Sequence, residues 1–436
     1  MTPGGRAAAA IELLGRLEAG GGPADRAIAG YFRNRRYAGS KDRGSVTNLV
    51  YGVLRRRAEL EWRLALAGAG GSSGANRARR LVLAQIATDR SVARSDPADI
   101  FTGEGHAPPL LDDEERRATG ALSGAVAETP PAWVAGNFPQ WLEPDLLAAF
   151  GGELGAEMVA LNARAPVDLR VNTARANRNQ VLERFAGENI AAEPCFYSAA
   201  GIRLSGRARI TGHALYREGR IEVQDEGSQL AAALVDARPG AQVVDLCAGA
   251  GGKALAVAAG MANRGQVFAC DTDKKRLARL GPRRARASAR NIQTHLLTGN
   301  DDPWLAAQAG RADRVLIDAP CSGSGAWRRN PDARWHLTPD ALAGFVQRQG
   351  ELLVRGAALV KPGGRLIYVT CSVLPCENEH QIESFLAAHS DFALLPAGRV
   401  WAEVMEVPYA TDATTLTLTP HRTGTDGFFV AIAERA

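Results

Sequence analysis

Strand-like runs alternate with helical patterns after about residue 221, and this alternation constrains the fold more than any other feature of the chain. The runs are AQVVDLC, QVFACD, IQTHLL, DRVLIDAP, RLIYVTC and GFFVAIAE. Strands separated by crossover helices form a parallel sheet with helices on both faces. We therefore predict a doubly wound α/β domain over residues 221–436. A strand near Phe392–Leu395 is followed by the last strand, near Phe428–Ile432, without a crossover helix pattern, so we expect seven strands with the last one antiparallel.

Three segments precede this domain. Residues 1–95 are predicted to be helical, because Val46, Leu49, Val50, Val53 and Leu54 recur at the spacing of one helix face. Prolines and ten acidic residues between positions 96 and 145 indicate a linker over residues 96–140. A helical pattern, LEPDLLAAF, and the strand candidates DLRVNT and GIRLS predict a small α+β module over residues 141–220.

Composition narrows the class of protein. The chain has 436 residues, of which 46% are hydrophobic and 23% charged, as in globular multidomain proteins. It has no apolar run of the ~18 residues that span a membrane, and Glu12 and Glu18 interrupt the N-terminal apolar stretch, unlike a signal peptide. Six cysteines without zinc-like spacing predict reduced thiols and no metal site. We expect a cytoplasmic protein and a monomer.

Positive charge is concentrated at the N-terminus. Residues 1–95 carry 17 lysines and arginines against 7 acidic residues, while the remaining residues carry 35 against 40. This clustering predicts contact with a polyanion such as RNA. A GC-rich genome explains the excess of arginine over lysine equally well, but not the clustering. Arg55, Arg56 and Arg57 cannot share one helix face, so at least one is expected to be a solvated charge. The other candidate cations are Arg33, Arg35, Arg36, Lys41 and Arg43.

A glycine-rich turn in VVDLCAGAGGK indicates a nucleotide-like ligand at the end of the first buried strand. A dinucleotide fingerprint needs a third glycine at position 254, which is alanine, and Ala254 also breaks the GK[ST] of a phosphate-binding loop. S-adenosylmethionine, which carries no phosphate, is the better ligand, although an ordinary tight turn stays open. Asp271 ends the next strand about twenty residues on, where a carboxylate can accept both hydroxyls of a ribose. We expect Asp273 to cap a helix.

Two cysteines follow neighbouring predicted strands. Cys321 lies in IDAPCSGSG and Cys371 in VTCSVLPCENE, so both are expected at one crevice beyond the carboxyl ends of the strands. A thiol acts as a nucleophile only as thiolate, so such a site must favour the charged form. We interpret Cys195, Cys270 and Cys376 as ordinary small hydrophobic residues.

A nucleophilic thiol beside a methyl donor indicates methylation of cytosine at C5. That carbon is too weak a nucleophile to attack a sulfonium methyl group until a thiolate adds to C6. Enzymes that methylate an exocyclic amine instead carry an [ND]PP[YF]-type loop at this point. Here the loop reads Asp318-Ala319-Pro320-Cys321.

These motifs together resemble the RsmB (Sun/Fmu) type of RNA cytosine-5 methyltransferase. The similar segments are VQDEGSQLAA, DLCAGAGGK, ACDTDKKRL, DAPCSGSGAWRRNPDARW, LVKPGGRLIYVTCSVLPCENE and TDGFFVA, and GSKDRGSVTNLVYGVLRRR resembles a NusB-like helical RNA-binding domain. The resemblance implies a class I, Rossmann-like methyltransferase domain preceded by a small RNA-binding module. DNA cytosine-5 enzymes use the Pro-Cys cysteine as nucleophile, so the presence of both cysteines favours RNA over DNA as substrate.

The resemblance also implies roles for individual residues. Cys371 would attack C6, Cys321 would assist product release, and Asp318 would contact both cofactor and cytosine. The expected contacts to S-adenosylmethionine are Cys247, Ala248, Gly249, Ala250, Gly251, Gly252, Lys253, Asp271, Asn300 and Asp318.

Three positions depart from the family pattern. Ala250 replaces a proline and Ala254 a threonine of the usual AAPGGKT turn. Asn300 follows Gly299 where the family has Gly-Asp, and the loss of this charge affects the expected cofactor affinity. Two alternatives therefore stay open. One is a noncatalytic RNA-binding assembly factor that keeps the fold, and the other is a tRNA enzyme of the same family.

Overall fold

The computed structural model describes residues 1–71, 73–89, 96–124, 128–206, 209–299, 301–409 and 413–436. Contacts divide the chain into two compact units, which we describe separately. The first holds residues 1–163 and 327–336, and the second holds residues 164–326 and 337–436. Among the described residues, no helix combines the length and apolar composition needed to cross a membrane.

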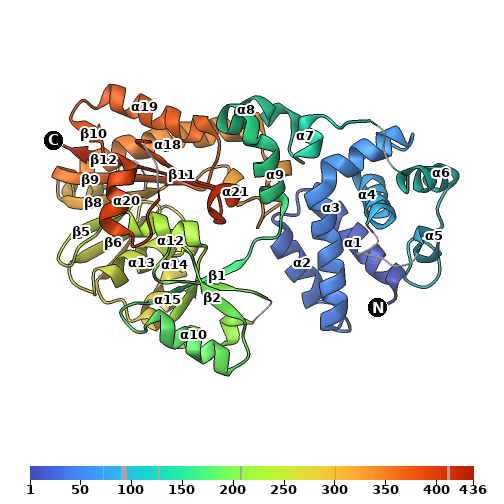
Figure 1. Ribbon diagram of the computed structural model, residues 1–436, viewed down its shortest axis with the longest axis horizontal. Coiled ribbons are helices and arrows are strands. Elements are labelled where there is room, and N and C mark those ends of the chain that lie inside the picture. Colours follow the sequence, from blue (N-terminus) through green and yellow to red (C-terminus); the bar gives the residue numbers. More distant parts are fainter. Residues whose placement is uncertain (72, 90–95, 125–127, 207–208, 300, 410–412) are drawn as a thin grey trace. The chain divides into compact units, whose positions relative to one another are not determined.

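The first unit is helical (Figure 1), and one hydrophobic core holds its helices α1 to α6 together. Its longest helix, α3 (Ser40–Leu66), buries all five apolar residues of the stripe predicted from the sequence. The other elements are α1 (Pro3–Glu18), α2 (Ala24–Arg33), α4 (Gly74–Thr88), α5 (Pro97–Ile100), α6 (Asp113–Leu122), α7 (Ala132–Ala135), η1 (Gln140–Leu142), α8 (Glu143–Phe150), η2 (Gly151–Glu153), α9 (Leu154–Asn162) and α17 (Ala333–His336).

Residues 96–140, which we expected to be a linker, carry helices of this unit. The acidic residues that indicated a solvated segment include Glu114 and Glu115, which pair with Arg80 at 2.9 Å and Arg79 at 2.7 Å. The acidic charge thus neutralises arginines of α4. The segment also contributes to the hydrophobic core Ile100, Phe101, Leu111, Ala118 and Leu122.

Two other boundaries differ from the expected ones. Helices α8 and α9 group with the helical unit, although we expected the α+β module to begin at residue 141. Residues 327–336 also group with it, although they lie within the expected α/β segment. Arg334 shows the physical reason, because its buried guanidinium donates to the Asn137 carbonyl and the Asn162 side chain, each at 2.6 Å. Burial lowers the pKa of Arg334 to about 9.

The second unit begins with a four-stranded antiparallel sheet of order β2–β3–β1–β4. Strands β1 (Val167–Val171) and β3 (Gly201–Leu204) fall on the predicted runs DLRVNT and GIRLS. The remaining elements are β2 (Ala192–Pro194), β4 (Ile221–Val223), α10 (Arg178–Gly187), η3 (Ile210–Gly212) and α11 (Ala214–Arg217). Helix α10 packs on the sheet through Val181 and Phe185, which share a hydrophobic cluster with Leu169 and Ile202.

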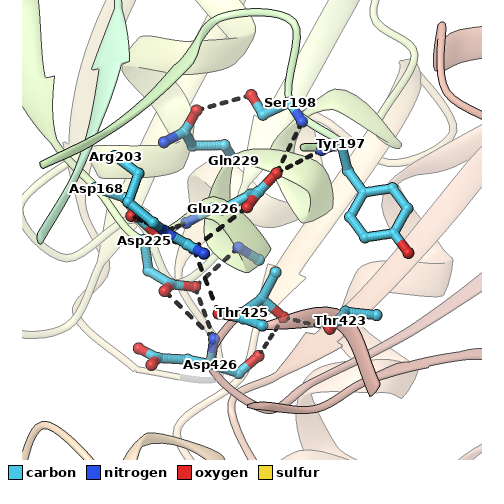
Figure 2. Close-up of polar contacts among 12 residues, drawn as sticks. Asp168, Tyr197, Ser198, Arg203, Asp225, Glu226, Gln229, Thr423, Thr425 and Asp426 are labelled. Atoms are coloured by element: carbon cyan, nitrogen blue, oxygen red, sulfur yellow. Dashed lines mark hydrogen bonds and ion pairs between the residues drawn. The ribbon is translucent and has the colours of Figure 1, made fainter. Parts of the chain in front are cut away.

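A buried ion-pair network joins this small sheet to helix α12 (Glu226–Ala233) (Figure 2). Arg203 on β3 forms hydrogen bonds of 2.8 and 3.0 Å with Asp168 on β1 and reaches Glu226 at 3.3 Å. Both carboxylates are buried, so Arg203 supplies the positive charge that their burial requires. Asp168, Glu226 and Cys195 also place three potential metal-ligand atoms within 4.8 Å of one another.

The large sheet has the strand order β10–β12–β9–β8–β5–β6–β7. Strands β5 to β9 pair in parallel, and β12 is antiparallel to both β9 and β10, which confirms the predicted seven-stranded path with its reversed last strand. The strands are β5 (Gln242–Asp245), β6 (Gln266–Asp271), β7 (Ile292–Leu296), β8 (Ala312–Asp318), β9 (Val360–Thr370), β10 (Phe392–Leu394) and β12 (Phe428–Arg435). An eighth, short strand that we did not predict, β11 (Leu416–Leu418), pairs with β12 off this path.

Helices cover both faces of the large sheet (Figure 1). One hydrophobic cluster joins the sheet to α12, α13 and α20, and another joins it to α18 and α19. The fold is therefore the Rossmann-like, doubly wound α/β arrangement that the sequence predicts. The helices of this domain are α13 (Gly252–Gly260), α14 (Lys274–Ala278), α15 (Leu280–Ala287), α16 (Pro303–Ala307), η4 (Ser324–Ala326), α18 (Pro339–Leu359), η5 (Pro375–Glu377), α19 (Glu379–Ala388), α20 (Ala397–Val404) and α21 (Pro420–Thr423).

Removing Arg203 should destabilise the second unit, because two buried carboxylates would lose their cation. We expect Arg203→Ala to lower the free energy of unfolding by on the order of 3 kcal/mol, measured from urea denaturation curves. Arg184→Ala removes an exposed arginine paired with Glu188 on a helix surface and should cost under about 1 kcal/mol. Equal losses in the two variants would contradict the structural role of the network.

Candidate functional site

The two cysteines that follow neighbouring strands meet in the structure. Strands β8 and β9 pair in parallel, with Asp318 beside Val369, so the loops after them leave the same edge of the sheet. The Sγ atoms of Cys321 and Cys371 lie 3.4 Å apart. This separation places both sulfurs within reach of one small planar group.

The surroundings of Cys321 oppose its ionisation. Its pKa lies well above the ordinary value because its sulfur shares a hydrogen bond with Cys371, because it is buried, and because the charges of Cys371 and Glu377 are nearby. Of the cysteines that we interpreted as hydrophobic residues, Cys195 and Cys270 are buried, and Cys376 is partly buried.

Both cysteines line a cavity of about 850 Å³ at the carboxyl edge of the sheet. Cys247, Asp271 and Asp318, three of the residues predicted to contact a cofactor, also line it. Within the described part of the chain, residues 248–253 do not line the cavity directly. Two of them bond to residues that do: Gly249 donates to Asp271, and Lys253 pairs with Asp318.

The glycine turn brings backbone amides close to this cavity. Gly251 has φ +80°, and a Cβ there would lie 2.2 Å from a Leu280 methyl carbon, so only glycine fits. The N–H of Gly249 donates to Asp271 at 2.7 Å. The carbonyl of Ala250, which stands where the family has proline, accepts a 2.7 Å bond from Arg283. A side chain from α15 thus holds the turn at the position where the proline ring is missing.

Asp273 caps a helix, as its sequence position predicts, whereas Asp271 is buried beside the cavity. Asp271 is buried and uses one oxygen for Gly249 and the other for the Asp273 N–H, also at 2.7 Å. Each oxygen keeps a lone pair for another donor. Asp273 is exposed and caps α14 by accepting from the N–H groups of Lys275 and Arg276.

Two aspartates and one lysine lie near this cavity. Asp245 ends β5, Asp318 ends β8, and Lys253 lies in α13. Lys253 Nζ lies 2.7 Å from Asp318 Oδ1. Asp245 is buried, and neither of its carboxyl oxygens has a hydrogen-bond partner among the described residues. Burial first, and then the nearby charge of Asp318, raise the pKa of Asp245 to about 8.

Sequence reasoning missed the cavity wall formed by α18. Phe345, Arg348, Glu351 and Arg355 on this helix line the cavity, together with Arg276 on α14. A signal was present, because Arg348 and Arg355 are seven residues apart and so share one helix face. Asn300, predicted to contact the cofactor, lies outside the described residues.

Most arginines of the basic N-terminal segment form ion pairs within the helical unit. Of the consecutive arginines in α3, Arg56 pairs with Glu59, Arg57 pairs with Glu61, and Arg55 donates to a backbone carbonyl, so none is the solvated charge that we expected. The other arginines within 4.0 Å of a carboxylate are Arg6, Arg16, Arg35, Arg63, Arg77, Arg79 and Arg80.

Four exposed cations remain at the junction of α2 and α3. Arg33, Arg36, Lys41 and Arg43 are exposed, and no described carboxylate pairs with them. Tyr37 lies among them in sequence and is 74% exposed. We name these five residues the junction patch.

Comparison with known proteins identifies the family. The model of the 16S rRNA methyltransferase RsmB/F family matches residues 232–433, and the model of the RsmF/B-like ferredoxin-like domain matches residues 138–211. The probable ribosomal RNA small subunit methyltransferase B of Synechocystis sp. is 34% identical over 69% of this chain and 67% of its own length. The ribosomal RNA small subunit methyltransferase B of Yersinia pseudotuberculosis is 30% identical over 90% of each chain.

A solved structure agrees with these relatives. The methyltransferase homolog protein from Pyrococcus horikoshii is 25% identical, with a TM-score of 0.60 over 70% of this chain and 98% of that one. The chain described here therefore belongs to the RsmB/F family of rRNA methyltransferases.

Proposed function

We propose that this chain transfers a methyl group from S-adenosylmethionine to C5 of a cytosine in ribosomal RNA, through a covalent bond between Cys371 and C6. The observation that carries this proposal is the 3.4 Å approach of two sulfurs in the cavity that also holds Asp318 and Asp271. Methylation of an amine or a hydroxyl needs no thiol, whereas methylation of C5 needs a nucleophile at C6.

The residues of the cavity fit S-adenosylmethionine. The remaining lone pairs of Asp271 suit the two ribose hydroxyls. The side chain of Asp318, which lines the cavity and pairs with Lys253, suits a ligand that carries an ammonium and a sulfonium group. Residues 247–253 form the turn behind them, with its backbone held by Asp271 and Arg283. When bound, S-adenosylmethionine supplies an electrophilic methyl group.

The two cysteines have different roles in the proposed reaction. Cys371 adds as thiolate to C6, which makes C5 nucleophilic. Cys321 keeps its proton at this stage, because its pKa is raised by the bond to Cys371 and by burial. After methylation, the C5 proton passes to water, the C6–S bond breaks to release Cys371 as thiolate, and Cys321 assists this release. We assign to Asp318 the contacts with cofactor and cytosine, because it lines the cavity beside both cysteines and pairs with Lys253 at 2.7 Å.

Variants of the two cysteines test this division. Cys371→Ala should abolish both methylation and the covalent RNA adduct, whereas Cys321→Ala should form the adduct and accumulate it, because only release is impaired. Denaturing gels of each variant with RNA and S-adenosylmethionine give the answer, with Cys376→Ala as a control that keeps turnover. An adduct from Cys371→Ala but none from Cys321→Ala would reverse the roles. Absence of product and adduct from the unaltered protein would favour the noncatalytic alternative.

The cofactor contact is tested at Asp271. Asp271→Ala removes the ribose acceptors and the bond that orders Gly249, so we expect a loss of about 1.5–3 kcal/mol, or roughly ten- to a hundredfold in Kd. Asp271→Asn keeps one acceptor and should lose less. Asp273→Ala, at the neighbouring helix cap, should leave Kd nearly unchanged in calorimetric titration. A larger increase in Kd from Asp273→Ala than from Asp271→Ala would show that the ribose binds beside Asp273 and not beside Asp271.

The junction patch is the RNA contact that the helical unit supports best. Its cations have no carboxylate to neutralise them, and exposed Tyr37 offers a ring on which a base can stack. Most other arginines of the segment are already neutralised by carboxylates of the same unit.

Replacing three cations of the patch should therefore weaken RNA binding and its salt dependence. We expect Arg33→Gln/Arg36→Gln/Lys41→Gln to flatten the slope of log K against log salt by about 0.7 for each lost phosphate contact. Arg16→Gln/Arg63→Gln/Arg116→Gln removes the same net charge from arginines that pair with Glu12, Glu59 and Asp113, and it should leave the slope nearly unchanged. Filter binding across a salt series measures both. Equal slopes for the two triple variants would show that the patch makes no specific contact.

A further inference from the structure

Glu377 is buried between the two cysteine loops, and the proposed chemistry does not yet use it. It ends η5, six residues after Cys371, and its side chain is fully buried. Oε1 accepts from the Ser322 N–H at 2.8 Å and from Gln349 Nε2 at 3.0 Å. Oε2 accepts from the hydroxyls of Ser322 and Ser372.

These four bonds join three separate elements. Ser322 follows Cys321, Ser372 follows Cys371, and Gln349 belongs to α18, the helix that lines the cavity. Gln349 also donates to the carbonyl of Pro320 at 2.9 Å, one residue before Cys321. One carboxylate therefore ties both cysteine loops to each other and to the cavity wall.

The charge of Glu377 has no partner cation among the described residues. Four N–H and O–H dipoles stabilise it, which is sufficient for a buried carboxylate when each oxygen is well bonded. The charge also opposes ionisation of Cys321, after the hydrogen bond to Cys371, the burial and the charge of Cys371. A neutral glutamine could make the same bonds, because the serine hydroxyls can rotate to accept from its amide group.

We infer that Glu377 is a positioning residue with two separable effects: its hydrogen bonds hold Cys321 and Cys371 at their mutual distance, and its charge keeps Cys321 as a thiol while Cys371 reacts. This inference rests on the proposed function for the roles of the two sulfurs. The bonding arrangement itself does not depend on that function.

Two substitutions separate the effects. Glu377→Gln keeps the bonds and removes the charge, whereas Glu377→Ala removes both. Glu383→Gln, at an exposed position on the following helix α19, is the control for a lost negative charge.

The first measurement needs neither RNA nor cofactor. The full-length protein is treated with iodoacetamide across a pH series, and alkylation of each cysteine is measured by peptide mass spectrometry. We expect Glu377→Gln to shift the profile of Cys321 to lower pH, and Glu383→Gln to leave it in place. Identical alkylation profiles of Cys321 in Glu377→Gln and in the unaltered protein would overturn the inference that the charge of Glu377 keeps Cys321 as a thiol.

The second measurement tests positioning through the covalent adduct with RNA. Glu377→Ala should slow adduct formation by on the order of a hundredfold, the usual cost of a reacting group misplaced by about 1 Å, with the KM for RNA unchanged. Glu377→Gln should restore the rate to within about tenfold of the unaltered protein. Adduct formation by Glu377→Ala at the unaltered rate would overturn the positioning role. If Glu377→Ala does not fold, Glu377→Gln carries the test. Adduct formation by Glu377→Gln as slow as that by Cys371→Ala would then overturn the positioning role.

The two measurements also separate this inference from the proposed function. An unaltered protein that forms no RNA adduct would contradict the proposed function, while the alkylation profiles would still decide whether the charge of Glu377 controls Cys321.

Discussion

The parallel pairing of β8 with β9 is the constraint on which the site depends. Parallel neighbours end at the same edge of a sheet, so loops that are fifty residues apart in sequence emerge side by side. Backbone bonds continue the pairing past the strands, from Ala319 N–H to the Val369 carbonyl at 2.8 Å and from Gly325 N–H to the Cys371 carbonyl at 3.0 Å. The sulfurs meet because the backbones that carry them are already bonded.

Several acidic side chains lie near the edge of the sheet where the parallel strands end, and their surroundings differ. Asp271 is stabilised by two backbone N–H groups, and Asp318 by Lys253. Glu377 is stabilised by four neutral donors. Asp245 is buried, and burial together with the nearby charge of Asp318 raises its pKa. Of these four acids, Asp245 is therefore the one whose surroundings oppose its ionisation.

Arginine serves mainly as an internal support in this chain. Arg203 neutralises two buried carboxylates, Arg283 holds the glycine turn, and Arg334 anchors residues 327–336 in the helical unit. Most arginines of α3 and α4 pair with carboxylates of the same unit. A count of lysines and arginines along the sequence therefore overestimates the exposed, unpaired positive charge. The cations of the junction patch are a small part of all the cations in the segment.

The sequence by itself determined the alternation of strands and helices, the glycine turn, and the placement of Cys321 and Cys371 after adjacent strands. These features follow from local periodicity and from the rule that parallel strands share an edge, so they could be predicted without coordinates. The stripe of α3 was predictable for the same reason. The linker assignment failed because composition cannot show that acidic residues of 96–140 find arginine partners in α4. Three features depend on contacts between residues distant in sequence, so only the tertiary structure reveals them. They are the cavity wall of α18, the four bonds of Glu377, and the grouping of residues 327–336 with the helical unit.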